Sequence, residues 1–518
     1  MSNDATPWWK SAVIYQIYPR SFADGGVGEA SVAGEVSVGE ASVGDLRGII
    51  DRLEHLSWLG VDAIWLSPVF RSPMADFGYD VSDFCDIDPV FGTLADLDQL
   101  VAACHARGLK LILDWVPNHT SIEHPWFQES RRDRTNPKAD WYVWRDEPAN
   151  NWKAAFPKGE SVWHWDEPRS QYYLRCFAKE QPDLNWDNPE VEAAMLDTLR
   201  FWLDRGIDGF RMDVVHLIGK DLFKDDPADA VARNHAHVTF NDAEVTHERL
   251  RAIRRVLDAY PGDRTSVGEV YLLDIAAMSR YHGAGDELHM SFNFAFLWAP
   301  PEPRALRDRI ALTLRHVDLI DAWPTWVLSN HDVVRHRQRH GGDENVARMM
   351  AVMLLTLRGT PFVYQGEELG LLDAVVPPER IVDLDGRDGC RAPIPWDPSP
   401  LHGWPADPWL PFPPEGEERN VTTLRDDPKS ILHLYRDLLT LRRAEADLQR
   451  SELTLLDLGD DVLAYRRGDG WMVVVNLGEQ PVTLGETVHV AISSDRGTDG
   501  ATIDAVSGRT AVVARREV

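Results

Sequence analysis

Cysteine is scarce in this 518-residue chain, and the cysteines present form no motif. None has the CxxC spacing typical of zinc or redox sites. They are Cys85, Cys104, Cys176 and Cys390. The first ten residues, MSNDATPWWK, also lack the basic start and apolar stretch of a secretory signal. We therefore expect a cytoplasmic protein with reduced thiols rather than a disulfide-linked one.

The sequence also has few long hydrophobic runs and few basic residues. The most apolar segment, residues 346–357, contains Arg348 and is too short to cross a bilayer, which takes about 20 residues. Lys and Arg number 54 against 83 Asp and Glu, a formal net charge of −29. Phosphate groups are bound through basic patches, so this balance argues against nucleic acid or a membrane surface as a partner.

What the sequence does contain is a regular alternation of short apolar runs with amphipathic segments. Strands are expected at 12–18, 61–66, 109–116, 207–212, 265–268, 289–293, 325–329 and 361–364. Helices are expected at 45–60, 93–108, 189–206, 248–260, 344–357 and 431–443. About eight such units predict an α/β fold with a (β/α)8 TIM barrel, although the sixth strand and fifth helix are irregular.

Two segments interrupt the alternation. Residues 118–187, after the third strand, are rich in Trp, of which the chain has 20, and predict an inserted subdomain. Residues 446–518 change to period-two patterns and predict a C-terminal antiparallel β-domain, a β-sandwich. The barrel then comprises residues 1–117 and 188–445. Residues 27–43 repeat VGEASV once, which fits a surface insertion better than a binding element.

Several expected strands run directly into reactive side chains. These are Asn118 and His119, Arg211 and Asp213, Glu269, and His331 and Asp332. A single acid at such a position can be a helix cap or an ion-pair partner. In a (β/α)8 barrel, however, the carboxyl ends of the strands all meet at one face, where the chemistry takes place. Three acids there predict one site.

Three carboxylates in a pocket lined by tryptophan suit glycoside hydrolysis. A retaining mechanism needs one ionised carboxylate to attack the anomeric carbon and one protonated carboxyl to protonate the leaving oxygen. Arg211 lies two residues before Asp213 and therefore on the same face of the strand, so it can orient Asp213 and hold it ionised.

The motifs around these acids resemble the α-amylase superfamily of retaining glycoside hydrolases, especially its bacterial α-glucosidase and oligo-1,6-glucosidase branch. The matching stretches are AVIYQIYPRSF, GVDAIWLSPVFRSPMADFGYDVSDF, DWVPNHTS, GFRMDVVH, VGEVY, LSNHD, GTPFVYQGEELG and GRDGCRAPIPW. They cover nearly the whole chain except the last 70 or so residues. The resemblance implies that Asp213 is the nucleophile, Glu269 the general acid/base, and Asp332 the carboxylate that binds the sugar 2- and 3-hydroxyls.

The same resemblance implies roles for the residues that bind the sugar. His119 and His331 correspond to histidines that bind hydroxyl groups, and Tyr79 to a stacking platform. Asp76 and Arg391 correspond to a charged pair that holds the non-reducing end and closes the pocket, which implies exo action. For Asp76, Tyr79 and Arg391, the alternative is a contact that stabilises a loop.

The sequence departs from the family pattern after the first strand. Many relatives have a calcium loop there that reads roughly DxNGDGxGD, but here Asp24 is followed by Gly25, Gly26 and Val27. Glycine supplies no ligand oxygen from a side chain, so we expect this calcium site to be lost and expect no metal or cofactor.

The sequence gives two conflicting indications of which glycosidic linkage the protein prefers. In relatives, Val after the nucleophile, here Val214, favours α-1,6 bonds, whereas the stretches around GVDAIWLSPVF favour α-1,4 or broad preference. We give more weight to the longer stretches.

The predicted function is exo-acting hydrolysis of short α-glucosides, a saccharide substrate, with some transglucosylation. The alternatives are an oligo-1,6-glucosidase and a transferring or isomerising relative that makes trehalose or isomaltulose. A non-catalytic, transporter-associated relative is disfavoured, because this sequence retains the full set of acids.

Overall fold

A computed structural model describes residues 6–26, 41–228 and 242–516. Eight parallel strands form the central sheet of the molecule. They are β1 (Ile14–Ile17), β2 (Ala63–Leu66), β5 (Lys110–Trp115), β9 (Gly209–Met212), β10 (Thr265–Gly268), β11 (Met290–Ser291), β12 (Thr325–Val327) and β13 (Thr360–Tyr364). Their order is β11-β10-β9-β5-β2-β1-β13-β12. The Thr325 hydroxyl at one end of this order donates to the Ser291 carbonyl at the other, so the barrel is nearly closed.

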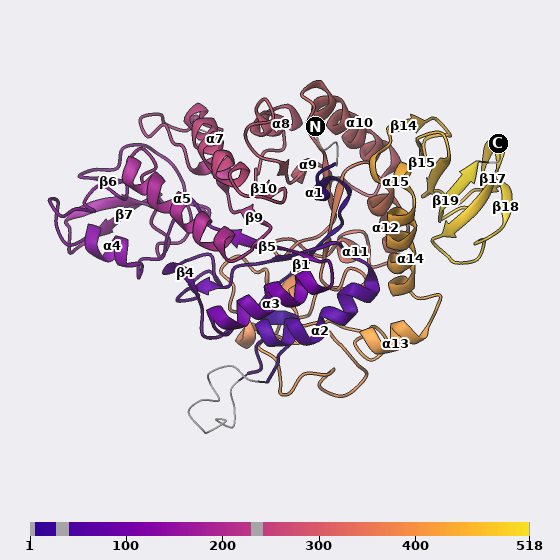
Figure 1. The fold of residues 1–518 in the computed structure, drawn as a ribbon, viewed down its shortest axis with the longest axis horizontal. Helices are drawn as coiled ribbons and strands as arrows, with labels where there is room; N and C mark the ends of the chain where they lie inside the picture. Colours follow the sequence, from indigo (N-terminus) through magenta and orange to yellow (C-terminus); the bar gives the residue numbers. More distant parts are fainter. Residues whose placement is uncertain (1–5, 27–40, 229–241, 517–518) are drawn as a thin grey trace.

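Helices surround the strands (Figure 1). The principal ones are α2 (Leu46–Leu59), α3 (Leu94–Ala106), α5 (Pro189–Asp204), α7 (Glu244–Asp258), α10 (Pro303–Leu319), α12 (Glu344–Thr356) and α14 (Ile431–Ala444). Their ends follow from the sequence: Asp45 caps α2 by accepting from the Gly48 amide, and Gly60 ends it in the left-handed region at φ 98°. The predicted (β/α)8 fold is confirmed.

The irregular part of the barrel lies between β10 and β12. The short α8 (Ile275–Ser279) and the 3-10 turn η4 (Arg280–His282) follow β10, and β11 has two residues, so the sequence signal is weak there. The long helix α10, which the sequence analysis did not predict, connects β11 to β12 through α9 (Phe294–Leu297).

Apolar side chains fill the interior of the barrel. They include Ile14, Ala63, Trp65, Ile112, Val267, Met290, Val327 and Phe362, all buried. Their neighbours along each strand point outward into the core shared with the helices. Arg211 of β9 and Asp114 of β5 are exceptions, because they place a buried ion pair inside the barrel.

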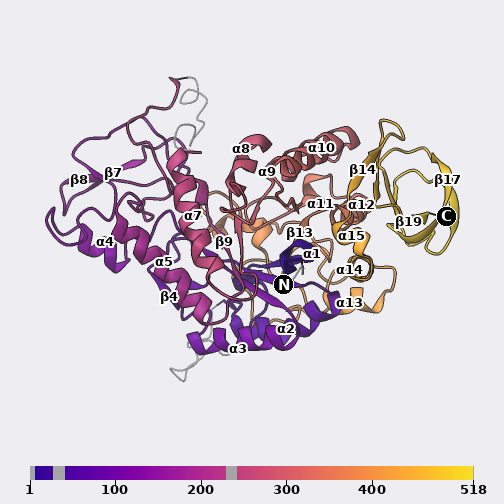
Figure 2. The ribbon, with the colours of Figure 1, turned by 45° about the horizontal axis from the view of Figure 1, so that its top comes forward.

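The inserted segment forms a unit at one end of the molecule (Figures 1 and 2). It has a helix, α4 (Pro125–Ser130), and an antiparallel sheet of β6 (Trp144–Arg145), β8 (Gln171–Leu174) and β7 (Trp163–Asp166). Trp152 and Trp163 lie in its own apolar core, which Val214 and Leu217 of the barrel join. The insertion is therefore packed directly against the segment that follows β9.

The C-terminal strands lie at the opposite end of the molecule (Figure 2). They are β14 (Leu453–Leu456), β15 (Val462–Arg467), β16 (Trp471–Asn476), β17 (Val482–Ser493), β18 (Thr502–Val506) and β19 (Thr510–Arg516). The sequence predicts a sandwich here, whereas hydrogen bonds join all six strands into one antiparallel sheet. One face packs on the barrel core beside α12, and the other encloses a second core. The domain boundaries given above remain predictions.

Most of the VGEASV repeat falls in residues 27–40, outside the described residues. Among the described helices, none is both long and apolar enough to cross a membrane.

Candidate active site

Arg211 organises the carboxylates at the C-terminal face of the barrel. Its Nη1 donates to Asp213 Oδ1 at 2.8 Å, and its Nη2 donates to Glu269 Oε2 at 2.5 Å. The guanidinium lies 5.3 Å from the centre of the Trp65 ring, inside the barrel. Asp213 directly follows β9 and Glu269 directly follows β10, so adjacent strands bring the two carboxylates to one arginine.

The Asp213 and Glu269 carboxyls are close enough to affect each other's protonation. Burial raises the pKa of Asp213 well above its ordinary value. Arg211 opposes this shift, while the charge of Glu269 and a hydrogen bond between the two carboxyls add to it. A retaining mechanism uses a neighbouring pair of acids, in which one carboxyl is protonated and the other is ionised.

Asp114 is a third acid on Arg211, and the sequence analysis missed it. Its Oδ1 accepts from Arg211 Nη1 at 2.9 Å, and its Oδ2 accepts from the Tyr79 hydroxyl at 3.1 Å and Trp65 Nε1 at 3.2 Å. Burial raises the pKa of Asp114 to about 7 even though Arg211 lowers it. A charged residue inside the buried run LILDWV was the available signal, because such a residue needs a partner.

Val214, directly after Asp213, has an unusual backbone. Its φ of 33° and ψ of 38° lie in the left-handed region, which is strained for a β-branched residue. In this conformation its amide donates to Glu269 Oε2 at 3.2 Å. The backbone at Val214 thus contributes a second donor, besides Arg211, that fixes the Glu269 carboxylate.

Asp332 follows β12 and is held by two arginines. Its Oδ1 accepts from Arg387 Nη1 at 3.0 Å and from Arg391 Nη2 at 3.1 Å. Burial alone would raise the pKa of Asp332, but the groups around it hold that pKa well below its usual range. The His331 ring is neutral because burial lowers its pKa to about 3, so the two guanidiniums keep Asp332 ionised.

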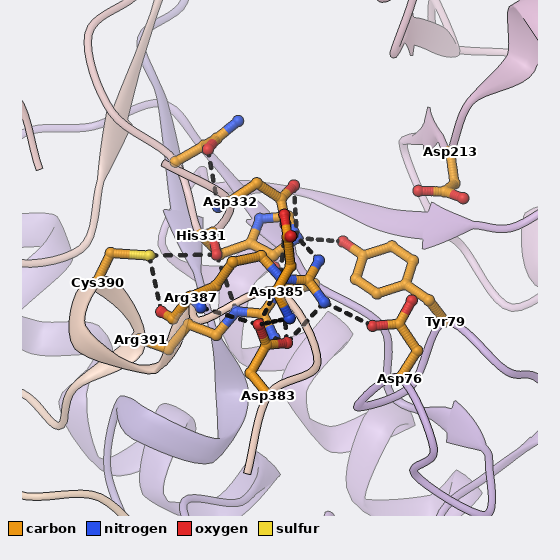
Figure 3. Close-up of polar contacts among 12 residues, drawn as sticks. Asp76, Tyr79, Asp213, His331, Asp332, Asp383, Asp385, Arg387, Cys390 and Arg391 are labelled. Atoms are coloured by element: carbon orange, nitrogen blue, oxygen red, sulfur yellow. Dashed lines mark hydrogen bonds and ion pairs between the residues drawn. The ribbon is translucent and has the colours of Figure 1, made fainter. Parts of the chain in front are cut away.

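The ion pair with Asp76 differs from the one the sequence predicts. Asp76 Oδ1 binds Arg387 Nη2 at 2.7 Å, not Arg391 (Figure 3). Arg391 is 0% exposed, does not line the pocket, and donates to the His331 carbonyl at 2.8 Å. The two arginines lie at either end of one 3-10 turn, η6 (Asp388–Arg391), so one can face the pocket while the other faces the core.

The predicted sugar-binding residues form one network, but not all of them reach the pocket. Tyr79 and His119 line it, whereas His331 is fully buried. The His331 ring stacks on the Tyr79 ring at 5.5 Å, and its Nε2 contacts Asp332 Oδ2 at 3.3 Å. Gln181, also missed in the sequence, donates from its side chain to Asp76 Oδ2 at 3.1 Å. His331 and Arg391 therefore support the residues that line the pocket.

A cavity of about 550 Å³ contains these groups. Asp213, Glu269 and Asp332 all line it, together with Asp76 and Arg387. The inserted segment forms part of the wall, but its tryptophans pack elsewhere. The aromatic lining is Tyr79, Phe156, Phe177, Tyr271, Phe294 and Trp298, so a single tryptophan lines the described pocket. The Trp excess mainly builds cores.

No set of three or more metal-binding side chains converges within the described ranges. At the altered calcium loop, the Asp24 carboxylate accepts from the Ser42 hydroxyl and from the Gly26 amide at 2.7 Å. Its neighbour Asp45 caps α2 and also accepts from the Gly25 amide at 3.0 Å. Both carboxylates therefore have local hydrogen-bond donors.

The fold and the three acids at its catalytic face define a glycoside hydrolase barrel, and comparison with known proteins identifies its family. Residues 16–451 match the α-amylase catalytic domain. The chain belongs to the α-amylase family of glycoside hydrolases.

The chain is similar over most of its length to several known proteins. It is 42% identical to a probable α-glucosidase of Rhizobium meliloti, with 89% of this chain and 87% of that protein covered. It is 37% identical to an oligo-1,6-glucosidase of Parageobacillus thermoglucosidasius, with the same coverage. The crystal structure of the α-glucosyl transfer enzyme XgtA superimposes with a TM-score of 0.88 at 39% identity, covering 99% of this chain and 100% of that one.

Proposed function

We propose that this protein is an exo-acting retaining α-glucosidase that removes terminal α-linked glucose from short oligosaccharides. The observation that carries the proposal is the arrangement of Asp213 and Glu269 on the two terminal nitrogens of Arg211, inside a pocket whose lining includes the Asp76–Arg387 ion pair. The identities of the relatives, α-glucosidases and oligo-1,6-glucosidases, support the same activity.

In this mechanism, Asp213 attacks the anomeric carbon while Glu269 protonates the oxygen of the leaving group. A covalent glucosyl-enzyme forms, and Glu269, now ionised, deprotonates the water that releases glucose. Arg211 keeps Asp213 oriented and partly offsets the cost of its ionisation. Asp332, held ionised by Arg387 and Arg391, binds sugar hydroxyls and stabilises positive charge on the ring in the transition state.

Asp76, Tyr79, His119 and Arg387 bind the sugar that is transferred. The ion pair between Asp76 and Arg387 blocks further chain beyond the non-reducing end, which restricts cleavage to terminal glucose. His331 and Arg391 act through Asp332 and Tyr79. We also place the enzyme in the reducing cytoplasm, which agrees with its four free cysteines.

Transfer to an acceptor sugar is a second candidate reaction. It is favoured by the likeness to the α-glucosyl transfer enzyme XgtA and to the trehalulose synthase MutB, which superimposes with a TM-score of 0.87 at 30% identity. Both reactions share the glucosyl-enzyme and differ in whether water or a sugar attacks it. Product analysis on maltose and sucrose separates them: free glucose must dominate if hydrolysis is the main reaction.

The test of the proposal compares the wild type with Asp213→Asn and Glu269→Gln on p-nitrophenyl α-glucoside. Both replacements keep the shape of the side chain and remove its acid function, so turnover should fall by at least about 10³-fold in each. Near wild-type turnover in either variant would contradict these roles. A panel of maltose, isomaltose, sucrose and trehalose then establishes the linkage preference.

A further inference from the structure

A second cavity lies at the end of the barrel opposite the catalytic acids. Its volume is about 250 Å³, and its lining includes Lys10, Arg254, His282 and His289. Lys10 belongs to the short helix α1 (Trp8–Ser11) that comes before β1, and His289 comes directly before β11, so the cavity lies where the strands begin. The acids follow their strands instead, and the strands are parallel. The cavity is therefore separate from the active site, and the proposed mechanism uses none of its residues.

Two cations, Lys10 and Arg254, line this cavity although the chain as a whole is acidic. The Lys10 Nζ lies 5.5 Å from the ring centres of both Trp9 and Trp323, which hold it by cation–π contacts. Within the described ranges, no carboxylate lies within 4.0 Å of this amine. Asp321 is the one acid among the described lining residues. The lining therefore carries a net positive charge, which suits an anion.

Arg254 is held in a fixed orientation on α7. Its Nε donates to Asp258 Oδ1 at 2.8 Å and its Nη1 to the Glu287 carbonyl at 3.2 Å, while its Nη2 has no hydrogen-bond partner in the described part of the chain. Burial, followed by the charge of Arg254, lowers the pKa of His289 to about 3, so the guanidinium lies close to that ring. An ordered guanidinium with an unused nitrogen is suited to bind an oxyanion.

The two histidines present one hydrogen-bond donor and one acceptor. The Ser266 amide donates to His289 Nδ1 at 3.2 Å, so the proton of this neutral ring is on Nε2. The Leu288 carbonyl can only accept, so His282 Nδ1 donates to it at 3.2 Å, and the neutral His282 ring has a bare Nε2. Burial lowers the pKa of His282 to about 4, which keeps this ring neutral.

Both rings are buried, with exposed fractions of 4% for His282 and 9% for His289. Neither Nε2 has a hydrogen-bond partner among the residues that the structure describes. Buried polar atoms without partners are costly, so a ligand that accepts from one ring and donates to the other would stabilise this cavity.

We propose that this cavity binds inorganic phosphate. Its charged oxygens accept from His289 Nε2 and lie against the cations of Lys10 and Arg254, while its hydroxyl donates to His282 Nε2. Inorganic phosphate keeps such a hydroxyl at neutral pH, whereas sulfate has none, so the acceptor at His282 discriminates between the two anions. A phosphate monoester loses its last proton near pH 6 and is therefore the poorer ligand at pH 7.5.

Isothermal titration with sodium phosphate at pH 7.5, at an ionic strength held constant with NaCl, tests the proposal directly. The wild type should show one saturable site per chain. Sulfate should bind at least about tenfold more weakly, because its binding leaves His282 Nε2 unpaired. Glucose 6-phosphate should also bind more weakly, and tighter binding of this ester would overturn the requirement for a hydroxyl. Lys10→Gln should weaken phosphate binding roughly tenfold.

Lys110→Gln is the matched control, because it removes the same charge from the same end of the barrel. The Lys110 amine binds Asp208 Oδ1 at 3.0 Å and does not line the cavity, so this variant should bind phosphate as the wild type does. Equal weakening in the two lysine variants would overturn the proposal, as would sulfate binding as tight as phosphate binding or the absence of a saturable site.

Inhibition kinetics separate this cavity from the active site. Phosphate should leave the KM for p-nitrophenyl α-glucoside unchanged, and competitive inhibition would overturn the proposal because it would place the anion among the catalytic acids. The titration itself requires no turnover, so its outcome is independent of the proposed α-glucosidase function.

Discussion

Replacing Arg387 by methionine should impair catalysis far more than stability, whereas the same replacement at Arg391 should do the reverse. Arg387 lines the pocket and joins Asp76 to Asp332. Arg391 is fully buried below it. The two residues are four positions apart and have the same chemistry, so each variant is the natural control for the other.

The contacts give the size of each effect. Without Arg387, Asp76 still accepts from Gln181, Asp332 still accepts from Arg391, and Asp383 keeps Arg391 and two backbone amides. No carboxylate is left without a partner, so the protein should stay folded. The pocket nevertheless loses two charge-assisted hydrogen bonds, each worth roughly 1.5 to 3 kcal/mol. If about 3 kcal/mol of this hydrogen-bond energy stabilises the transition state, its loss lowers kcat/KM roughly 150-fold.

Arg391→Met also takes one guanidinium from Asp332 and one from the buried Asp383, but in addition it leaves the His331 carbonyl, in the core, without this donor. Breaking a buried ion pair costs roughly 3 to 5 kcal/mol, so unfolding should begin at clearly lower urea concentration.

Two measurements on each variant distinguish the outcomes: the urea midpoint followed by tryptophan fluorescence, and kcat/KM on p-nitrophenyl α-glucoside below the unfolding transition. An Arg391→Met enzyme with wild-type stability and greatly reduced activity would refute the reasoning. It would mean that Arg391 serves catalysis, either through Asp332 or, as the sequence alone implies, by facing the substrate, and that it does not mainly stabilise the fold.

Two further predictions concern stability away from the pocket. Burial raises the pKa of Glu367 to about 8 from an ordinary value near 4.5, so the folded state keeps a proton that the unfolded state releases. The stabilisation from this group is complete below about pH 4.5 and is lost as pH rises through 8, a change of several kcal/mol in the free energy of unfolding. In Glu367→Gln, the midpoint of urea unfolding should therefore vary less with pH over this range. An unchanged pH dependence would contradict the assignment. The buried Arg467 guanidinium donates to four carbonyls at the contact between the C-terminal sheet and the barrel. Arg467→Met should therefore lower the free energy of unfolding in urea by roughly 3 to 5 kcal/mol and leave kcat/KM unaltered. An unchanged urea midpoint would contradict this prediction. Those carbonyls belong to Thr356, Asp447, Leu448 and Ser451.

The strand-end acids could be predicted because their placement depends on local sequence and on one rule of topology. Each apolar run fixes where its strand stops, and parallel strands in a barrel bring all such ends to one face. Asp213, Glu269 and Asp332 therefore come together whatever the loops do. Arg211 could be placed on the same face as Asp213 because side chains two residues apart in a strand point to the same side.

Arg387 and Arg391 could not be told apart in this way. Both lie in GRDGCR, a loop segment without the periodicity that assigns a face to each residue. Which arginine turns outward depends on Asp383, which comes before the motif and binds both guanidiniums, and on the His331 carbonyl, which comes from another strand end. These are tertiary contacts, so the sequence could indicate only that a charged pair exists.

The tryptophans show a similar limit of composition. Trp152 and Trp163 are buried in the core of the inserted segment, whereas Trp298 lines the pocket. An indole ring serves a core and a ligand equally well, and only its surroundings distinguish the two uses. Trp298 has a neighbouring tyrosine, an anchored arginine and an exposed face, none of which is adjacent to it in sequence.

The net charge of −29 carries little information about function, but the local balance of charge in the pocket does. Three guanidiniums, Arg211, Arg387 and Arg391, contact six carboxylates: Asp76, Asp114, Asp213, Glu269, Asp332 and Asp383. Even with one of these carboxylates protonated, the site keeps an excess of negative charge. Fixed negative charge in the pocket stabilises positive charge that develops in the transition state more than it stabilises a neutral ground state. A sugar ring acquires such charge when its glycosidic bond breaks, so the arginines serve to fix the carboxylates in place without cancelling their field.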